Sequence, residues 1–324
     1  MFLDEVDTDN ILMNNKLDAK IIFIEGIASS GKSTTGQLLY SNLYKQGYTV
    51  KLIHEFHSPH PIHEFNIEEP KIWISKTLAN WRDLADTLVK TNEIMIMDGT
   101  LFQCTIGVLL EMDVKVPIIC KYANQIPDIL KPLNPILIYF YQNDIERALR
   151  TAYEQREDGW RRRVNDFVSN ARFFKNRKLY GLDGYIEYNR VLRNITDSLY
   201  SEYNLKKISI ENSAGDWNLY HHIIADFLSV PPVEPDNIQH NDYTGVYKDS
   251  ESTRKCLIKK NDNKLEIHGY YTIPKYLILK ECDNFLVQGK PIELLFRKNK
   301  FGLIDVMEIK GPDEKSGNEI WMKT

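Results

Sequence analysis

The chain has 324 residues, of which 43% are hydrophobic and 27% are charged. That length suits two domains, and the composition is ordinary for a globular protein that can bury a sizeable core. Its 41 basic and 45 acidic side chains give a net charge of −4, which provides no general electrostatic surface for nucleic acid. A nucleic-acid partner is therefore disfavoured, although a local basic patch stays open.

Neither the cysteines nor the apolar runs point to export or to a membrane. The 4 cysteines are scattered without a C-x-x-C pair, so zinc-site and disulfide-framework interpretations both fail and reduced thiols are expected. No apolar run reaches membrane-spanning length, and the N-terminal residues are acidic rather than a basic signal region. We therefore expect a cytoplasmic protein without a membrane partner.

The first pattern with chemical content follows a polar N-terminal arm. An apolar run at 21–24 predicts a buried parallel strand, and apolar residues at helical spacing after residue 32 predict a helix that ends near Gly47. Between them, Gly26 to Ser33 fits G-x-x-x-x-G-K-[ST], the phosphate-binding loop. Strand, glycine loop and helix stand in the order that phosphate binding needs, which disfavours an accidental glycine turn.

This loop predicts a nucleoside triphosphate, ATP, together with Mg²⁺. Glycines let the backbone curl so that its N–H groups and the helix N-terminus face an anion. Lys32 would reach the β- and γ-phosphates, and the Ser33 hydroxyl would complete the shell of the Mg²⁺. The predicted nucleotide contacts are Gly26, Ser29, Ser30, Gly31, Lys32, Ser33 and Thr34.

The second predicted strand, residues 49–53, ends at His54 and Glu55. A carboxylate at the C-terminal end of a parallel strand projects into the crevice where ligands bind. Glu55 is therefore a candidate general base for a substrate hydroxyl, or a positioner of metal or water. A solvated loop acid is the competing interpretation.

Histidines recur at every third position of the next stretch, at His54, His57, His60 and His63. Prolines at 59 and 61 exclude a regular helix, whereas polyproline II would place all the imidazoles along one edge. A metal site is one interpretation, but an extended chain separates successive turns by about 9 Å, too far for one ion without a fold-back. A substrate-facing or plain surface loop is favoured.

A helix is predicted over 70–90, with Trp73 and Trp81 in a broad apolar stripe. Trp81 and Arg82 are candidate substrate-binding residues, because an aromatic ring stacks on a planar ligand and a guanidinium grips an anion or a carbonyl edge. The competing interpretation places the tryptophans in the core, and it is favoured for at least one of them.

The third predicted strand, 93–97, closes on Asp98. An acid at that position, downstream of a phosphate-binding loop, predicts the carboxylate that holds Mg²⁺ or its waters. Ser33 and Asp98 are thus the candidate metal ligands. An apolar helix at 106–110 and a strand at 135–141 follow.

Arginines gather after that strand, at Arg147, Arg150, Arg156, Arg161, Arg162 and Arg163, with Asp158-Gly159 at a break. Phosphoryl transfer needs cations on the transferring group, and a mobile lid can bring them while excluding water. A charge run is often only a solvated face, and about half of these arginines fit that description.

A long helix is predicted over 180–203, a last strand over 206–210 and a final helix to about 228. Alternation of strands and helices throughout 19–229 predicts an α/β fold, a parallel sheet with helices on both faces. A proline-rich linker at 231–235 then separates a first domain, 1–230, from a second, 236–324.

The second domain is predicted to be an antiparallel meander or small barrel, because short strands recur between turn signals without a convincing helix. The predicted strands are 244–247, 255–259, 265–268, 277–279, 285–288, 292–297 and 303–309. Nothing in this part has catalytic spacing. We therefore expect the second domain to be an interaction module or a module that covers the lid of the first domain.

Residues 19–229 resemble the thymidylate kinase and deoxynucleoside kinase group of P-loop kinases. The resemblance implies a P-loop NTPase three-layer fold and ATP-dependent phosphoryl transfer. Glu55 falls where deoxynucleoside kinases carry the acid that activates the substrate hydroxyl, and Trp81-Arg82 falls where thymidylate kinases carry a substrate-contacting arginine. The resemblance also implies that Asp98 is the signature acid and that Gln103 lies in the substrate-facing helix. Arg150 and Arg156 correspond to the lid arginines, and residues 213–217 correspond to the loop near the adenine.

One position departs from that family. Gly99 stands where the signature has an arginine, so a ligand for substrate phosphate or sugar is missing and an ordinary nucleoside or thymidylate substrate is in doubt. The Asp-Gly pair is instead similar to the strand end of adenylate-kinase-like enzymes. Residues 241–310 look like small β domains appended to some bacterial enzymes.

The leading hypothesis is an ATP-dependent phosphotransferase acting on a small nucleoside- or nucleotide-like acceptor. A kinase of a non-nucleotide hydroxyl compound, such as an antibiotic, is the second. The third is a nucleotide-dependent binding or regulatory protein without catalysis. A polynucleotide kinase is disfavoured by the acidic balance, and a homodimer stays open.

Overall fold

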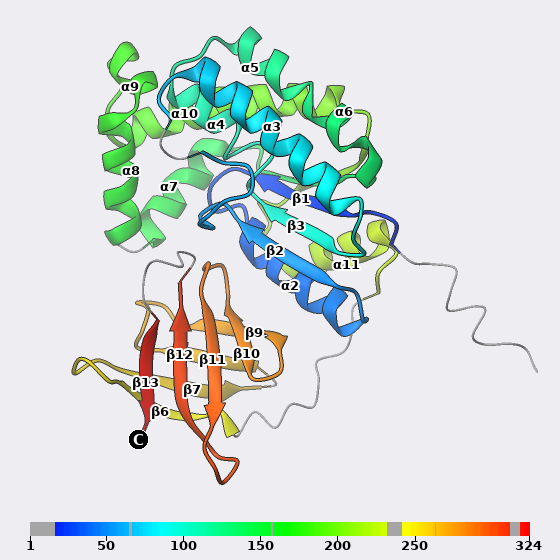
Figure 1. Ribbon diagram of the computed structural model, residues 1–324. Helices are drawn as coiled ribbons and strands as arrows, with labels where there is room; N and C mark the ends of the chain where they lie inside the picture. Colours follow the sequence, from blue (N-terminus) through cyan, green and yellow to red (C-terminus); the bar gives the residue numbers. More distant parts are fainter. Residues whose placement is uncertain (1–16, 65–66, 157, 232–241, 263, 312–317) are drawn as a thin grey trace, which may run out of the picture.

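The computed structural model describes residues 17–64, 67–156, 158–231, 242–262, 264–311 and 318–324. An α/β part comes first in the chain, and a separate antiparallel β-barrel follows (Figure 1). Most of the predicted linker and nearly all of the predicted N-terminal arm lie outside the described residues. Among the described residues, no helix is both long enough and apolar enough to cross a membrane.

The α/β part is built on a parallel sheet with the strand order β2-β3-β1-β4-β5. Its strands are β1 (Ile21–Gly26), β2 (Val50–His54), β3 (Ile94–Asp98), β4 (Ile136–Tyr141) and β5 (Lys206–Glu211). The central strands are apolar almost throughout because helices cover both of their faces. All of the predicted strands of this part are confirmed.

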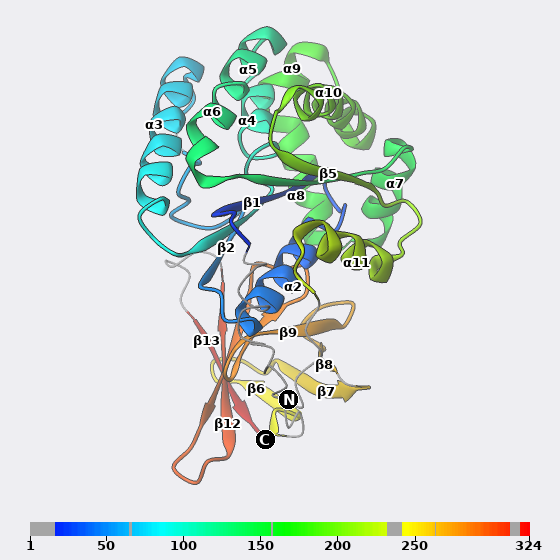
Figure 2. The ribbon, with the colours of Figure 1, turned by 90° about the vertical axis from the view of Figure 1, so that its right-hand side faces the viewer.

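The two faces of the sheet bury different sets of residues. Ile21 and Phe23 of β1 point to one core, whereas Ile22 and Ile24 point to the other, as the two-residue period of a strand requires. On the first face lie α3 (Pro70–Leu88), α4 (Ile106–Glu111), α5 (Val116–Ala123), α6 (Ile126–Leu130) and α10 (Gly181–Glu202). On the second lie α2 (Lys32–Lys45) and α11 (Trp217–Leu228), as Figure 2 shows.

Between β4 and α10 in the chain come three helices that project beyond the sheet. They are α7 (Ile145–Gln155), α8 (Asp158–Asn170) and α9 (Arg172–Arg177). The Asp144 carboxylate caps α7 by accepting from the backbone N–H of Arg147 at 2.9 Å. The chain leaves the helix at Arg156, which adopts an extended conformation. α7 therefore ends at the extended Arg156, whereas Asp158 and Gly159, where the break was predicted, begin α8.

The C-terminal part is a closed barrel with the order β10-β11-β12-β13-β6-β7-β8-β9. Its strands are β6 (Gly245–Asp249), β7 (Lys255–Asn261), β8 (Lys264–His268), β9 (Lys275–Glu281), β10 (Asn284–Val287), β11 (Glu293–Lys298), β12 (Ile304–Lys310) and β13 (Glu319–Lys323). The barrel alternative to a meander is thus correct. One strand, β13, escaped sequence prediction, and it closes the barrel between β12 and β6.

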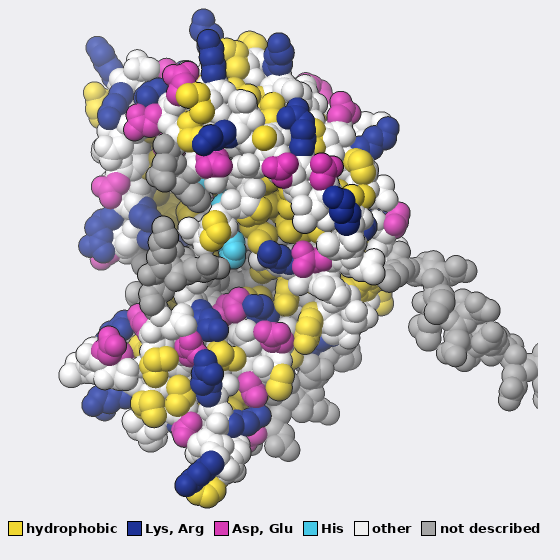
Figure 3. Space-filling view, viewed as in Figure 1, with side chains coloured by type: hydrophobic (Ala, Val, Ile, Leu, Met, Phe, Trp, Pro, Cys, Tyr) yellow, Lys and Arg dark blue, Asp and Glu magenta, His cyan; other side chains and the backbone are white. Residues whose placement is uncertain are grey.

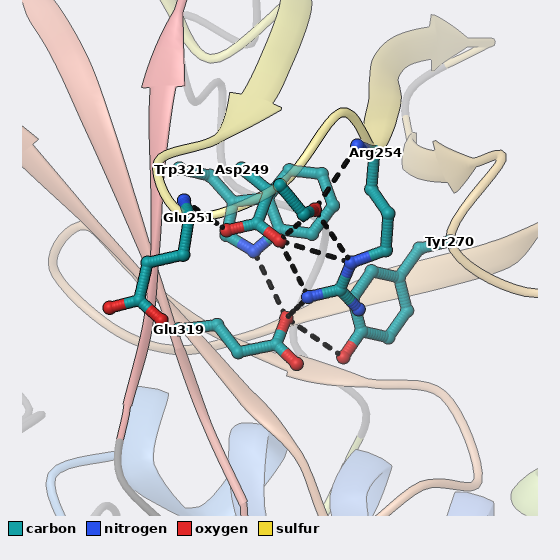
Figure 4. A network of polar contacts seen from close by, with 7 residues as sticks. Asp249, Glu251, Arg254, Tyr270, Glu319 and Trp321 are labelled. Atoms are coloured by element: carbon teal, nitrogen blue, oxygen red, sulfur yellow. Dashed lines mark hydrogen bonds and ion pairs between the residues drawn. The ribbon is translucent and has the colours of Figure 1, made fainter.

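A polar network holds β13 in place (Figure 4). The Arg254 guanidinium contacts the Asp249 carboxylate at 2.7 Å and the Glu319 carboxylate at 3.3 Å. Glu319 also accepts hydrogen bonds from the Trp321 indole at 3.1 Å and the Tyr270 hydroxyl at 3.3 Å. Hydrogen bonds from Ser252, Glu251 N–H and Arg254 lower the pKa of Asp249 to about 2. Each of these groups has a protein partner, so the network secures the barrel.

The barrel packs directly on α2. Ile278 of β9 and Leu286 of β10 are buried in the same core as Leu39 and Tyr40 of α2. The barrel therefore lies on the helix-covered second face of the sheet, beneath the helix that follows the glycine loop (Figure 2).

Candidate functional site

The candidate site lies where the carboxyl ends of β1, β2 and β3 meet. Gly26 begins the glycine loop after β1, His54 and Glu55 follow β2, and Asp98 ends β3. Ile24 pairs with Asp98, and Asp98 pairs with His54, so these strand ends are adjacent in the sheet. The predicted convergence of their side chains at one edge is present.

The glycine loop needs its glycines for two physical reasons. Gly26 and Gly31 have φ values of 148° and 86°, which L side chains rarely adopt. A Cβ on Gly26 would lie 2.6 Å from the Phe140 carbonyl oxygen, and one on Gly31 would lie 2.1 Å from the Trp217 ring. Ser29 also adopts a left-handed conformation, with φ 67°. The loop is tightly curled and closely packed on its neighbours.

The loop leads into α2 without a side-chain cap. Gly31 stands at the N-cap and offers no oxygen to the first-turn N–H groups, which carry the positive end of the helix dipole. The Lys32 ammonium folds back over the loop and donates to the Ile27 carbonyl at 3.0 Å. Lys32 is only 6% exposed. A helix N-terminus and a buried cation thus face the same small volume, which suits an anion.

Two residues after β5 brace the loop: Asn212, which was not among the predicted site residues, and Trp217, which falls in the 213–217 segment that the resemblance placed near the adenine. The Asn212 amide donates to the Ser30 carbonyl at 2.6 Å, and the Trp217 ring lies against Gly31. Asn212 directly follows β5 and Trp217 begins α11, so both lie at the same edge of the sheet. Their position directly after a predicted strand was the available signal.

Glu25, on β1 itself, is a buried acid that sequence reasoning missed. Its Oε1 accepts a hydrogen bond from the Leu101 N–H at 2.6 Å. Burial raises the pKa of Glu25 to about 8, although the nearby Lys32 ammonium pulls it down. A single acid within an otherwise apolar strand was the signal.

Glu55 and Asp98 are the two predicted acids, and both are in the cluster. Burial raises the pKa of Glu55, with the Lys32 charge acting in the opposite direction. Its Oε2 has no hydrogen-bond partner among the described residues, and neither has either oxygen of Asp98, which is 1% exposed and has the His54 ring 3.4 Å from Oδ2. Buried carboxylate oxygens without partners are costly, so this arrangement favours a cationic or hydrogen-bonding ligand.

His54 lies between the two predicted metal ligands. Its Nε2 is 3.3 Å from the Ser33 hydroxyl and 3.4 Å from the Asp98 carboxylate. In the described part of the chain, no group of three or more His, Cys, Asp or Glu residues is arranged to hold a metal ion. Mg²⁺ does not require such a cage, because it commonly takes one or two protein oxygens, waters and phosphates. The hard oxygens of Ser33 and Asp98 fit that requirement.

The structure separates the two predicted lid arginines. The Arg156 guanidinium donates to the Ser29 hydroxyl at 3.1 Å and contributes a favourable charge to Glu55. Arg150 instead pairs with Asp183 at 2.7 Å and with Glu146 at 3.0 Å, and it is 44% exposed. Arg156 is therefore at the glycine loop, whereas Arg150 belongs to a surface ion-pair group.

The predicted substrate-binding residues also divide. Trp81 is 0% exposed and packs edge-on against Phe23, so the core interpretation holds for it and for Trp73. Arg82 is exposed on α3. Gln103 lies on the loop after Asp98, and its side-chain oxygen is buried without a partner among the described residues. Of the three, Gln103 alone lies on the loop leading from the acid cluster.

A first prediction separates packing from binding at Trp81. Trp81→Phe should lower the free energy of unfolding by about 1–3 kcal/mol, because it leaves a void in a filled core. The KM for the acceptor should stay within a few-fold of the parent value. Denaturant unfolding and steady-state kinetics measure the two quantities. A raised KM with unchanged stability would instead make Trp81 a substrate contact.

The histidine loop does not align its imidazoles as an extended edge. His60 is buried and its Nδ1 accepts from the N–H groups of Ile62 at 3.1 Å and His63 at 2.8 Å. These bonds fold the loop back on itself. Burial lowers the pKa of His60 to about 3 and that of His63 to about 4. His60 is thus a neutral structural residue.

A second prediction follows for acid stability. Because the folded pKa of His60 lies below the ordinary 6.5, its contribution is fully present above pH 6.5 and is lost as the pH falls toward 3. His60→Asn, whose side-chain oxygen can replace Nδ1 as acceptor, should make the fall in unfolding free energy shallower by up to about 1.4 kcal/mol per pH unit in that range. The exposed His222→Asn serves as the control and should leave the slope unchanged. An unaltered slope in His60→Asn would show that His60 is not held neutral.

The molecule is hollowed between its α/β part and its barrel on the face drawn in Figure 3, and histidine side chains surface there. A separate cavity of about 600 Å³ also lies between the two parts, and its described lining residues include no histidine. It begins at Ala28, Ser29 and Thr34 of the glycine loop and α2, and α7 forms another wall. Another cavity, of about 680 Å³, lies at the opposite, amino edge of the sheet, near Asn134 and Lys206. Ligands of parallel α/β sheets bind at the carboxyl edge, so the first cavity is the relevant one.

Comparison with known proteins gives no independent assignment. No protein-family model matches this chain, and no curated protein matches it.

Proposed function

We propose that this protein is an ATP-dependent phosphotransferase of the P-loop type, acting on a small acceptor. The supporting observation is the convergence of a curled glycine loop, the uncapped N-terminus of α2, Lys32 and buried acids at one edge of a parallel sheet. An anion and a cation can be held there side by side. That combination is what a nucleoside triphosphate with its metal requires.

Lys32 and Arg156 are the cations proposed to act on the phosphates. Lys32 lies over the glycine loop, and Arg156 reaches the same loop from the start of the α7–α8 connection. Charge spread over the transferring phosphoryl group would be stabilised by both, together with the first-turn N–H groups of α2. Because Arg156 lies where α7 ends, a shift of α7 and α8 would move this cation toward or away from the loop.

Ser33 and Asp98 are proposed to hold the Mg²⁺, which when bound supplies positive charge on the phosphate oxygens. His54, between them, would be displaced or would orient one of the ligand oxygens. Asp98 is held rigidly, because it is fully buried at the end of a central strand.

Glu55 is proposed to take the proton from the acceptor hydroxyl or to orient that hydroxyl. Its raised pKa makes the carboxylate a stronger base than an exposed glutamate. Its Oε2 has no partner among the described residues, so the oxygen is available to an acceptor. Gln103, with a buried side-chain oxygen on the adjoining loop, is the proposed hydrogen-bonding partner of the acceptor.

Two acceptor classes remain in competition. The resemblance to thymidylate and deoxynucleoside kinases favours a nucleoside- or nucleotide-like acceptor. Gly99 favours a non-nucleotide hydroxyl compound, because it stands where the family has an arginine that contacts the substrate. A Cβ at this position would lie 2.7 Å from the Glu55 carboxylate and 3.3 Å from the Lys32 side chain. No side chain can occupy the place of the missing signature arginine without displacing those two groups, so the substrate contact that it supplies is absent.

A competition between acceptor pools tests the choice of class. Purified protein with Mg-ATP is incubated with a nucleoside and nucleotide mixture, and separately with a mixture of aminoglycoside, sugar and polyol compounds. Mass spectrometry then detects any compound that gains one phosphoryl group. Gain in the first pool alone supports the nucleoside-like acceptor, and gain in the second alone supports the alternative.

A further inference from the structure

The barrel approaches the glycine loop through one connection, residues 287–290 between β10 and β11. The Gln37 side chain, on α2 and 3% exposed, uses all of its hydrogen-bonding groups on this connection. Its amide donates to the carbonyls of Val287 at 3.0 Å and Lys290 at 2.9 Å, and its oxygen accepts from the Gly289 N–H at 2.8 Å. The connection is therefore fixed in place on α2.

The approach is close enough to need a glycine. Gly289 has a φ of 64°, and a Cβ there would lie 3.2 Å from the Thr34 hydroxyl. Thr34 comes directly after Lys32 and Ser33 in the proposed phosphate-binding motif. The barrel backbone thus touches the helix turn that would bind phosphate, and Ile278 and Leu286 bury apolar surface beside it.

The cavity of about 600 Å³ is bounded by both parts of the molecule. Ser29, Thr34, α7 and Ser213 form the α/β side, and Ile273, Lys275, Gln288, Gly289 and Lys290 form the barrel side. The volume falls within the range of about 300–1,000 Å³ that small-molecule sites occupy.

The charge of this cavity is strongly positive. Its basic lining residues are Arg147, Arg156, Lys275 and Lys290, and Asp144 is the acidic one among the described lining residues. The Asp144 carboxylate is already engaged as the cap of α7. An anionic small molecule that reaches Ser29 and Thr34 fits this lining, whereas a neutral or cationic one does not.

We propose that the barrel is part of the donor nucleotide site, with Lys275 and Lys290 contacting the bound nucleoside triphosphate from the side opposite α7. This inference rests on the proposed function and adds a binding role for a module that the sequence marked as an interaction or covering domain. Gln37 fixes the 287–290 connection, which includes Lys290, and the Gln288 N–H of that connection donates to the Tyr276 carbonyl at 2.9 Å, next to Lys275. Both lysines therefore line the cavity before the nucleotide arrives, so little ordering cost remains at binding.

Equilibrium binding of a non-hydrolysable ATP analogue with Mg²⁺ tests the inference in the full-length chain. The double variant Lys275→Ala/Lys290→Ala should raise the Kd about 10- to 100-fold, since each charge-assisted contact contributes a sizeable part of the affinity. The matched control is Lys259→Ala/Lys260→Ala, on exposed positions of β7 that do not line the cavity. Its Kd should equal that of the parent, and both variants should melt like the parent.

Photolabelling with an azido-adenine ATP gives a second readout that a structural role would not move. Label should appear in the peptide that spans 273–290 as well as in the α/β part. The inference would be overturned if the parent binds the analogue, the Kd of the double variant lies within two-fold of the parent value and label is confined to the α/β part. That result would leave the proposed function intact. A parent that binds no nucleotide would overturn both.

Discussion

Lys32→Ala should reduce ATP-dependent turnover to background, a loss of about 10³-fold, while the protein stays folded. The Lys32 ammonium lies over the glycine loop and bonds to the Ile27 carbonyl, so its charge is directed at the proposed phosphate position. The fold should survive because, among the described residues, the hydrogen bond of this ammonium goes to a carbonyl of its own loop. Loss of this cation should also raise the pKa of Glu25 and of Glu55 further, since its charge lowers both.

The matched control is Lys71→Ala, which removes an exposed lysine at the start of α3. Steady-state rates at saturating Mg-ATP and circular dichroism spectra are compared for parent, variant and control. The control should retain parental activity. Full activity in Lys32→Ala would contradict the assignment of residues 26–33 as the phosphate-binding loop.

Glu55→Gln and Asp98→Asn should fail in different ways. Glu55→Gln should lower kcat by about 10²- to 10⁴-fold with nearly unchanged ATP affinity, because general base catalysis acts on the acceptor. Asp98→Asn should lower kcat and also shift the Mg²⁺ dependence to higher concentration, because it removes a charged ligand oxygen. Both substitutions keep the side-chain shape, so packing changes should be small.

Titration of Mg²⁺ at fixed ATP, together with kcat and the Kd for ATP, separates the two roles. Glu69→Gln, an exposed acid just before α3, is the control. If Glu55→Gln keeps kcat within a few-fold of the parent, Glu55 is a bystander and the acceptor contact moves to Asp98 or to the loop of His57 and His63. An unshifted Mg²⁺ dependence in Asp98→Asn would remove Asp98 from the metal site.

The sheet and most of the acid cluster could be predicted because buried parallel strands leave a recognisable pattern in the sequence and bring the residues that follow them to one edge. A buried parallel strand reads as an apolar run, and the first polar residues after it must lie at one edge of the sheet. Glu55 and Asp98 were found in this way. Glu25 was not, because a single acid inside an apolar run gives no indication of what it contacts until the loop at Leu101 folds over it.

Spacing alone could not separate Arg150 from Arg156. Both belong to one arginine-rich stretch, but α7 ends after Gln155 and directs Arg156 toward Ser29, whereas Arg150 stays on the helix surface with Asp183. Helix ends are set by local capping and by tertiary contacts together, and these contacts come from distant residues. The role of Gly99 is similar, since the crowding by Glu55 and Lys32 appears only in three dimensions.

The short antiparallel strands of the barrel were predicted, but the strand that closes it and its packing on α2 were not. The segment of β13 is short, and its sequence Glu-Ile-Trp-Met-Lys has three consecutive apolar residues, so no apolar–polar alternation marks it in the sequence. The docking on α2 depends on Gln37 and Gly289, residues more than two hundred positions apart in the chain, whose pairing no local pattern announces. Contacts of such separation are visible only once both parts have folded.

Transfer of the labelled γ-phosphate of ATP to a small-molecule extract tests the central claim most directly. Parent protein and Lys32→Ala are incubated with radiolabelled ATP, Mg²⁺ and a metabolite extract, and the products are separated by chromatography. We predict that label moves to a discrete small molecule with the parent and does not move with the variant. Parent protein that binds ATP but transfers no label to any compound would contradict a phosphotransferase and leave a nucleotide-dependent binding protein.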